Sequence, residues 1–352
     1  FLLDGIEVYR DSPQFLYITN ESISNQTQSK NFVLNNLDHE IRILRFESVN
    51  LLFFKYLGKQ EMYLNGQLLS NHRAQIFSNG ASLKTPVTKH VYYSDIISCF
   101  LEDRMEDPLT FKVNNVQYNF RNKKVGLQKT SFHTESGNLI GVMGGSGTGK
   151  STFLNLMNGS HRPTSGNVTI NGIDIHQDKD KIQGIIGFVS QEDLLIEELS
   201  VYNNLYYNAK LCFRDLTELQ IKTRVKEVLE DVGLSEVRDL IVGSPLQKMI
   251  SGGQRKRLNI ALELIREPAV MFVDEPTSGL SSRDSENIMD LLKELTLAGK
   301  LIFVVIHQPS SEIFKMFDRL LILDQGGHPI YDGNPIDAVV YFKTEANHVN
   351  AE

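Results

Sequence analysis

The first part of the chain alternates between short apolar runs and turn-forming residues. Three of the runs are rich in aromatic and β-branched side chains, which favour strands, and they lie at residues 15–19, 40–46 and 49–56. The pairs Asn65-Gly66 and Asn79-Gly80 are typical of tight turns between strands. Residues 94–101 fit either a final helix or a final strand. We therefore predict a small, mainly β domain over residues 1–107.

From Pro108 onwards, the apolar runs alternate with stretches of helical periodicity. Continuous apolar runs are typical of strands that are buried on both faces of a sheet, and they lie at residues 139–143, 185–189, 269–273 and 300–306. From about residue 195 to 268 the pattern is helical, with one apolar face that includes Val225, Val228, Leu229 and Val232. We therefore predict an α/β domain over residues 108–352, with a helical subdomain at about 195–268.

Three more elements complete this second pattern. Residues 285–297 have the periodicity of an amphipathic helix. The runs at 320–323 and 329–333 predict the two strands of a closing hairpin, and a short helix is expected after Asn334.

The apolar run at 139–143 leads into a glycine-rich segment and then into a helical pattern. The segment reads Gly144-Gly145-Ser146-Gly147-Thr148-Gly149-Lys150-Ser151-Thr152. Glycines let the backbone turn so that its N–H groups point at phosphate oxygens, and the N-terminus of the next helix adds a partial positive charge. Lys150 can bridge the β- and γ-phosphates, and the Ser151 hydroxyl can hold Mg²⁺. This strand–loop–helix order favours a triphosphate-binding loop over an ordinary glycine-rich turn.

Two acids and a histidine follow later buried strands. Asp274 and Glu275 come directly after the run at 269–273, and His307 follows the run at 300–306. Ligands bind at the carboxyl edge of such parallel strands. Asp274 would hold Mg²⁺, and Glu275 would be the base that orients an attacking water. His307 can contact a γ-phosphate from the same edge, although a lone histidine is more often simply packed.

A helix is predicted to begin after Ser251, which is a good N-cap. It starts with Gly252-Gly253-Gln254, continues with the basic run at 255–257 and is stopped by Pro268. Basic side chains in a first turn oppose the helix dipole, which prefers anions there. Bare glycines and basic side chains at a helix start suit an approaching phosphate, and the alternative is an exposed, capped helix.

Composition and charge narrow the class of protein. The 352 residues carry a formal net charge of −7, which argues against a nucleic-acid partner. Cys99 and Cys212 form no zinc or disulfide pattern. No run reaches the roughly 18–20 apolar residues of a membrane span. Because the chain begins with Phe1, we expect a fragment of a longer protein.

Taken together, these motifs resemble the ATP-binding subunit of ABC transporters. The resemblance covers about residues 109–342 and rests on motifs in a fixed order: the phosphate loop, Gln191, Ser251-Gly252-Gly253-Gln254, Asp274-Glu275 and His307. The amino-acid sequence at 251–258, 274–280 and 307–310 is most similar to the G subfamily, which includes exporters of lipids, sterols and drugs. The resemblance implies an α/β P-loop NTPase fold, with a mixed-sheet core and a helical subdomain, preceded here by the small β-domain.

The resemblance also implies how the parts would work. Two copies would close head to tail around two ATP molecules, each held between the phosphate loop of one copy and the Ser251 helix start of the other. Phe120 matches the aromatic residue that stacks on the base, and Gln191 would link Mg²⁺ to a transmembrane partner in the same longer chain or in a separate subunit. The ATPase would then act at the cytoplasmic face of a membrane, with Glu275, His307 and Lys150 as its catalytic residues. Ser281 stands where the family usually has an aspartate.

Two other functions fit parts of the sequence. A non-transport ABC-type ATPase, as in translation or DNA repair, would carry two ATPase halves or a long coiled-coil insertion, and neither is visible. Residues 63–69 and 77–83 resemble the last strands of forkhead-associated domains, which would suit a phosphopeptide-binding or scaffold protein. The phosphothreonine-binding arginine and serine motifs of that family are not visible before them. We therefore expect a structural or regulatory role for residues 1–107.

Overall fold

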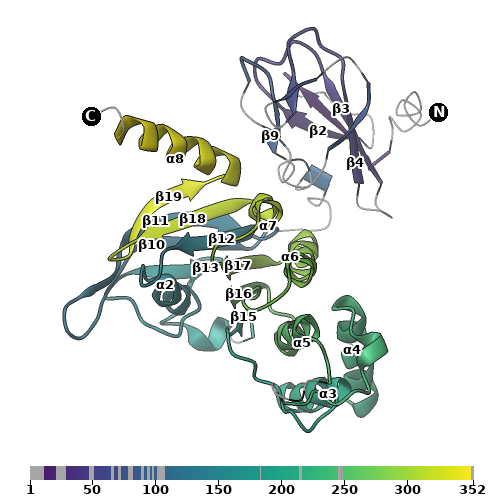
Figure 1. Cartoon of the computed structure of the whole chain (residues 1–352), viewed down its shortest axis with the longest axis vertical. Coiled ribbons are helices and arrows are strands. Elements are labelled where there is room, and N and C mark those ends of the chain that lie inside the picture. The colour runs from purple at the N-terminus through teal and green to yellow at the C-terminus, as the bar shows by residue number, and fades with distance from the viewer. Residues whose placement is uncertain are drawn as a thin grey trace. The chain divides into compact units, whose positions relative to one another are not determined.

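Figure 1 shows the computed structural model of the chain. It describes residues 12–20, 29–46, 51–64, 67–69, 73–77, 82–88, 91–92, 96, 99–100, 108–182, 184–213, 216–244, 247 and 249–349. The chain divides into two compact units, Phe1–Asp107 and Pro108–Glu352. The turns predicted at 65–66 and 79–80 lie outside the described residues, as does most of the element predicted at 94–101.

The first unit contains two β-sheets. The five-stranded sheet has the order β2-β1-β3-β4-β7 and is built from β1 (Phe15–Thr19), β2 (Lys30–Val33), β3 (Ile41–Phe46), β4 (Leu51–Tyr56) and β7 (Gln75–Phe77). The four-stranded sheet has the order β6-β5-β8-β9 and is built from β5 (Tyr63–Leu64), β6 (Gln67–Leu68), β8 (Ser82–Lys84) and β9 (Val91–Tyr92). This unit is strand-rich, as its aromatic and β-branched runs predict, while its likeness to forkhead-associated domains stays a prediction.

A six-stranded sheet forms the centre of the second unit. Its order is β15-β16-β17-β12-β18-β19, from β12 (Leu139–Gly144), β15 (Ile186–Val189), β16 (Val270–Asp274), β17 (Leu301–Val305), β18 (Arg319–Asp324) and β19 (His328–Gly333). Neighbouring strands from β15 to β18 pair in parallel, and β19 closes the sheet as an antiparallel hairpin with β18. The carboxyl ends of the parallel strands therefore share one edge, which is where ligands bind in such sheets.

A second sheet and a set of helices surround this centre. The antiparallel sheet has the order β11-β10-β13-β14, from β10 (Thr110–Asn119), β11 (Val125–Glu135), β13 (Ser165–Ile170) and β14 (Ile173–Asp174). The helices are α2 (Lys150–Met157), α3 (Val201–Cys212), α4 (Glu218–Asp231), α5 (Gly252–Leu264), α6 (Ser282–Leu297), α7 (Ser311–Met316) and α8 (Pro335–Val349), with short 3₁₀ turns η4 (Lys179–Ile182) and η5 (Ser235–Val237). Figure 1 shows α3 and α4 beside α5, away from the strands. None of the helices in the described part of the chain is both long and apolar enough to cross a membrane.

The central strands are buried on both faces, which explains their continuous apolar runs. Successive residues of β17 alternate between two apolar clusters, so that Ile302 and Val304 pack on one side and Phe303 packs on the other. The first cluster includes residues of α5 and α6, and the second includes the apolar face of α2. The phosphate-loop candidate is thereby fixed between a rigid strand and a helix that packs on the same sheet.

Two helix boundaries differ from the sequence prediction. Helix α6 begins at Ser282 rather than at residue 285, because the Ser281 hydroxyl accepts a hydrogen bond from the backbone N–H of Asp284 and caps the helix. The helix predicted to be short after Asn334 is α8, which has 15 residues. Its Tyr341 and Phe342 rings lie 5.7 Å and 6.0 Å from the ring of Tyr331 on β19, so the helix packs on the hairpin.

Candidate functional site

The glycine-rich loop connects β12 to α2 in the middle of the six-stranded sheet. It leaves the strand at Gly144, with φ of 151°, and enters the helix through Gly149, with φ of 97°. A β-carbon on Gly144 would lie 2.3 Å from the carbonyl oxygen of Leu323, and one on Gly149 would lie 2.7 Å from that of Gly126. Both positions therefore require glycine, and the loop is packed tightly between neighbouring backbones.

Lys150 begins α2, and its side chain folds back over the loop. Its Nζ donates hydrogen bonds to the carbonyl oxygens of Gly144, at 3.0 Å, and Gly145, at 2.7 Å. The same atom lies 3.3 Å from Nε2 of His307. The Thr148 hydroxyl also donates to the Gly145 carbonyl, at 3.0 Å, and holds the loop from inside. The structure thus brings the histidine at the end of β17 to the lysine of the loop.

Asp274 and Glu275 lie at the same edge, and both are half-buried. Burial raises the pKa of the Asp274 carboxyl, and the nearby charge of Glu275 raises it further, while Lys150 opposes the shift. Burial lowers the pKa of Lys150, and the charges of Glu275 and Asp274 oppose that change. One cation and two carboxylates therefore share a single, partly desolvated region.

The backbone is strained where two of the strands end. Glu275 has φ of 47°, and Gln308, which follows His307, has φ of 46°. A non-glycine residue in this left-handed region costs about 1–2 kcal/mol, and such residues cluster at functional sites. The Glu275 amide donates to the carbonyl of Val305 at 3.0 Å, and its carboxylate accepts a hydrogen bond from Gln191 Nε2 at 3.1 Å. The side chains of Gln191 and Glu275 are therefore held together.

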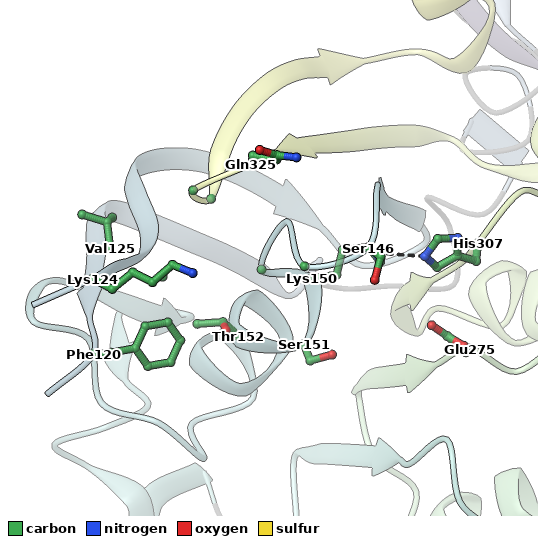
Figure 2. Close-up of a pocket in the computed structure, with 15 residues that line it drawn as sticks. Phe120, Lys124, Val125, Ser146, Lys150, Ser151, Thr152, Glu275, His307 and Gln325 are labelled. Atoms are coloured by element: carbon green, nitrogen blue, oxygen red, sulfur yellow. Dashed lines mark hydrogen bonds between the residues drawn. The ribbon is translucent and has the colours of Figure 1, made fainter. Parts of the chain in front are cut away.

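A cavity of about 710 Å³ opens over the glycine-rich loop (Figure 2). In this view Phe120, Lys124 and Val125 lie at one end, and His307 and Glu275 lie at the other. The remaining lining residues are Gly126, Ser146, Gly147, Gly149, Lys150, Ser151, Thr152, Gln325, Gly326 and Gly327. Five predicted residues do not line the cavity. Three of them, Gly144, Gly145 and Thr148, take part in the hydrogen bonds that support the loop. Gln191 contacts Glu275, and the charge of Asp274 acts on Lys150.

Phe120 lies just after β10 at the end of the cavity that is remote from His307. Its side chain is 39% exposed. The ring of Tyr118 packs against it edge-on, with the ring centroids 5.2 Å apart. A β-carbon on Gly126 would lie 2.7 Å from the Phe120 ring, so the glycine leaves space for that ring. The result is a positioned aromatic ring on the cavity wall.

Ser251, Gly252, Gly253 and Gln254 lie outside this cavity. The Ser251 hydroxyl accepts a hydrogen bond from the Gln254 N–H at 3.1 Å, and the Gln254 side chain accepts one from the Ser251 N–H at 2.8 Å. This reciprocal capping box fixes the start of α5, with Ser251 exposed. The four residues therefore do not meet the phosphate loop of the same chain.

Two of the three basic residues after this capping box, Arg255 and Lys256, do not crown the helix start as the sequence suggested. Arg255 is 5% exposed, and its guanidinium donates to Asp193 at 3.0 Å and to the carbonyl of Gly243 at 2.6 Å. The Lys256 ammonium donates to the carbonyl of Gln191 at 2.5 Å and lies 3.4 Å from Asp193. Both cations are neutralised within the chain, because an unpaired buried charge would be costly.

The sequence interpretation missed two sides of the cavity. Lys124 ends the turn before β11, and Val125 and Gly126 begin that strand. Gln325, Gly326 and Gly327 form the turn between β18 and β19. The Gly-Gly pair is a recognisable turn signal. Nothing in the pair itself indicates that this turn packs beside the phosphate loop.

Ser281 has a structural role that the sequence did not reveal. Besides capping α6, its hydroxyl donates to the Asp284 carboxylate at 2.8 Å. A β-carbon on Gly253 would lie 2.8 Å from the Asp284 Oδ1, so this carboxylate packs on the start of α5. The residue in the place of the usual aspartate thus orients an aspartate three positions later.

Comparisons with known proteins agree with this fold. Residues 127–278 match the ABC transporter family. Among curated proteins, a probable ATP-dependent permease of Saccharomyces cerevisiae is 31% identical over 284 residues, which are 78% of this chain and 27% of that protein. ABC transporter G family member 28 of Arabidopsis thaliana is 35% identical over 73% of this chain and 23% of that protein. The chain therefore spans about a quarter of the length of these relatives.

Solved structures give the same result for the fold. CbiO1 of Clostridium perfringens, described as part of the ABC transporter complex cbiONQ, matches with a TM-score of 0.60 and 28% identity, over 70% of this chain and 96% of that chain. A dimeric ATP-binding cassette in a post-hydrolysis state, bound to ADP and Pi, matches with a TM-score of 0.54 and 29% identity, over 64% of this chain and 98% of that chain. The chain thus contains the ATP-binding ATPase domain of ABC transporters, similar to the domain of G family members.

Proposed function

We propose that this chain is the ATP-hydrolysing part of an exporter, and that it closes head to tail with a second copy around two ATP molecules. The observation that carries this proposal is the single cavity that joins an exposed aromatic ring, Phe120, to the group formed by Lys150, Glu275 and His307. Its volume of about 710 Å³ is in the range of ligand pockets, which is 300–1,000 Å³.

The two ends of the cavity suit the two ends of ATP. The Phe120 ring would stack on the adenine base, a contact worth about 1–3 kcal/mol where aromatic rings and bases meet. Lys150 would turn from the carbonyls of Gly144 and Gly145 to the β- and γ-phosphates. These carbonyl bonds hold the ammonium at the mouth of the loop. The short movement that this exchange requires favours Lys150 as the phosphate-binding cation.

At the far end, Glu275 would orient the attacking water and accept its proton. Its strained backbone and its hydrogen bond to Gln191 hold the carboxylate beside the cavity. His307 would contact the γ-phosphate, because its Nε2 already lies 3.3 Å from the ammonium that would bind the same group. Catalysis of this kind depends on positioning and on charge stabilisation more than on covalent chemistry.

The donor set also fits Mg²⁺. Ser151 offers a hydroxyl that lines the cavity, Asp274 offers a carboxylate at the end of β16, and Gln191 offers an amide oxygen beside Glu275. Mg²⁺ prefers oxygen ligands and is usually held by one or two carboxylates together with substrate phosphates. When bound there, the ion would neutralise charge on the phosphate oxygens.

Closure with a second copy would complete the site. The Ser251–Gln254 segment does not meet its own phosphate loop, yet its capped helix start leaves Ser251 exposed. The N-terminus of a helix attracts phosphate. We infer that this segment covers the ATP held by the second copy. The similarity to a dimeric ATP-binding cassette supports this arrangement.

The proposal includes a transmembrane partner and a place at the cytoplasmic face of a membrane. The curated relatives are several times longer than the part that this chain matches, and one of them is named as a permease. A transmembrane domain, either in the same longer protein or in a separate subunit, would be moved by the closing and opening of the ATPase pair.

The test compares the parent chain with Glu275→Gln. We expect the parent to hydrolyse ATP. Glu275→Gln should bind ATP without hydrolysing it and should accumulate as a dimer, whose mass by analytical ultracentrifugation is twice that of the monomer. Glu236→Gln removes an exposed carboxylate in η5, far along the chain from the cavity residues, and should behave like the parent. A parent chain that neither binds nor hydrolyses ATP would overturn the proposal, and ATP hydrolysis that survives in Glu275→Gln would remove Glu275 from the catalytic role.

A further inference from the structure

The turn between β18 and β19 forms one wall of the cavity. This turn belongs to none of the nucleotide-binding motifs described above. Gln325, Gly326 and Gly327 make up this turn, and all three residues line the cavity. They are separated by more than 170 positions in the sequence from the phosphate loop that they face. Their position therefore reflects tertiary packing rather than a local motif.

Backbone contacts fix the turn to the rest of the site. The N–H of Gln128 on β11 donates to the carbonyl of Gly327 at 2.9 Å. A β-carbon on Gly327 would lie 2.5 Å from the carbonyl oxygen of Gly126, and the same oxygen would be 2.7 Å from a β-carbon on Gly149. The Gly126 carbonyl is thus enclosed between the turn and the start of α2. Any shift of the turn would disturb the end of the phosphate loop.

The side chain of Gln325 lies over the middle of the cavity. In the view of Figure 2 it lies between the Phe120 end and the His307 end, across the loop from Ser151 and Thr152. It is exposed, and its amide makes no hydrogen bond to the rest of the described chain. A carboxamide has two donor hydrogens and one acceptor oxygen, so it can pair with a hydroxyl or with a phosphate oxygen.

We propose that Gln325 is a further nucleotide-binding residue, and that its amide hydrogen-bonds an oxygen at the ribose–α-phosphate part of ATP. The proposal rests on the proposed ATP-binding function of the cavity. With the base at Phe120 and the γ-phosphate at His307, the ribose and the α-phosphate occupy the section of the cavity beneath Gln325. The close packing of Gly126, Gly149 and Gly327 then holds this amide at a fixed position over the loop.

The test measures the dissociation constants of the whole chain for two probes, Mg²⁺-ATP and Mg²⁺-tripolyphosphate, which lacks the nucleoside. A hydrogen bond of ordinary net strength predicts that Gln325→Ala binds ATP roughly three to ten times more weakly than the parent. The matched control is Gln177→Ala, which removes an exposed glutamine side chain that does not line the cavity. Unfolding temperatures equal to that of the parent check that both variants are folded.

The tripolyphosphate result separates the two possible acceptors. Weaker binding of ATP alone indicates a ribose hydroxyl, and equally weaker binding of both probes indicates a phosphate oxygen; either result supports the proposal. ATP binding by Gln325→Ala that equals the parent, or an equal loss in Gln177→Ala, overturns it. A parent chain that binds neither probe would instead overturn the ATP-binding function itself, and the role of Gln325 with it.

Discussion

Arg255 donates a 3.0 Å hydrogen bond to the Asp193 carboxylate, and this pair fastens the start of α5 to the segment after Gln191. Asp193 also accepts a hydrogen bond from the Asn259 amide at 2.6 Å, and the Lys256 ammonium lies 3.4 Å away. One carboxylate therefore holds three side chains of the same helix. Because Gln191 in turn contacts Glu275, the cluster links the Ser251 helix start to the proposed catalytic base.

We expect Asp193→Asn to lower the free energy of unfolding by about 1–3 kcal/mol. Breaking a fully buried ion pair costs about 3–5 kcal/mol, because the remaining charge is left without a partner. Arg255 is almost completely buried, but the Asp193 side chain is 26% exposed, so water recovers part of that cost. Urea unfolding at pH 7 measures the difference.

The control for this prediction is Asp239→Asn. Asp239 pairs with Arg238 at 3.3 Å, but the two side chains are 86% and 53% exposed. Exposed pairs contribute about 0–1 kcal/mol, so this variant should unfold almost like the parent. Equal destabilisation by the two substitutions would show that the burial of Arg255 has no special effect.

Gly144→Ala should abolish ATP binding and destabilise the fold. The new methyl group would lie 2.3 Å from the Leu323 carbonyl oxygen and 2.6 Å from the Thr148 hydroxyl, and neither the strand nor the loop can move away freely. Overpacking of this kind typically costs about 1–3 kcal/mol. Calorimetric titration with ATP, together with thermal unfolding, tests both effects.

Gly172→Ala separates this clash from backbone strain alone. Gly172 also has a positive φ, of 80°, but a β-carbon there would meet no atom within 4 Å. The left-handed backbone alone costs about 1–2 kcal/mol for alanine, so this variant should lose stability yet keep its ATP affinity. Loss of ATP affinity in Gly172→Ala would mean that general destabilisation explains the Gly144 result.

His307→Ala should lower the rate of ATP hydrolysis by about 10²–10³-fold, the range for removal of one positioned hydrogen-bond donor that stabilises charge in the transition state. ATP affinity should change by less than a factor of about three, because the base and most phosphate contacts remain. Steady-state hydrolysis and ATP titration give the two values. His133→Ala, which alters an exposed histidine on β11, should match the parent in both. Equal loss in affinity and rate would assign His307 to binding instead.

Local signals were sufficient for much of the second unit. The phosphate loop could be predicted because the strand, the glycines and the helix are consecutive in the sequence. The hairpin of β18 and β19 follows from two apolar runs and the turn between them. The early start of α6 could also have been found, since Ser281 followed three positions later by Asp284 is a capping pattern.

Contacts between distant segments could not be predicted in this way. Nothing near Gln325 in the sequence indicates that its turn packs on Gly126, and nothing near Arg255 indicates that its partner is Asp193, 62 positions earlier. In the first unit, the parallel pairing of β1 with β2 likewise depends on a connection whose path the sequence does not encode locally. Each of these features is determined by which surfaces meet after folding.

Asp274→Asn should raise the free energy of unfolding at pH 7 while abolishing ATP hydrolysis. Burial and the charge of Glu275 raise the pKa of Asp274 more than Lys150 lowers it, so the folded chain holds this proton more tightly than the unfolded chain. Stability therefore falls as pH rises from the ordinary value of 3.8 through the raised pKa, and the whole cost is present above that pKa. Removing the charge should restore about 0.5–2 kcal/mol, the common size of a single stabilising substitution.

The opposite sign is expected for Asp318→Asn, which makes it the informative control. The Asp318 carboxylate accepts hydrogen bonds from Lys293 Nζ at 2.6 Å and from the Leu139 N–H at 2.7 Å, and the two charged side chains are 6–7% exposed. Its loss would leave the buried Lys293 ammonium unpaired, which costs about 3–5 kcal/mol. Urea unfolding between pH 4 and pH 8 should show the fall of stability with pH in the parent and a smaller fall in Asp274→Asn. If both substitutions destabilise the chain, then the Asp274 carboxylate stabilises the fold as a partner of Lys150. The hypothesis that its charge lowers the stability of the fold would then be wrong.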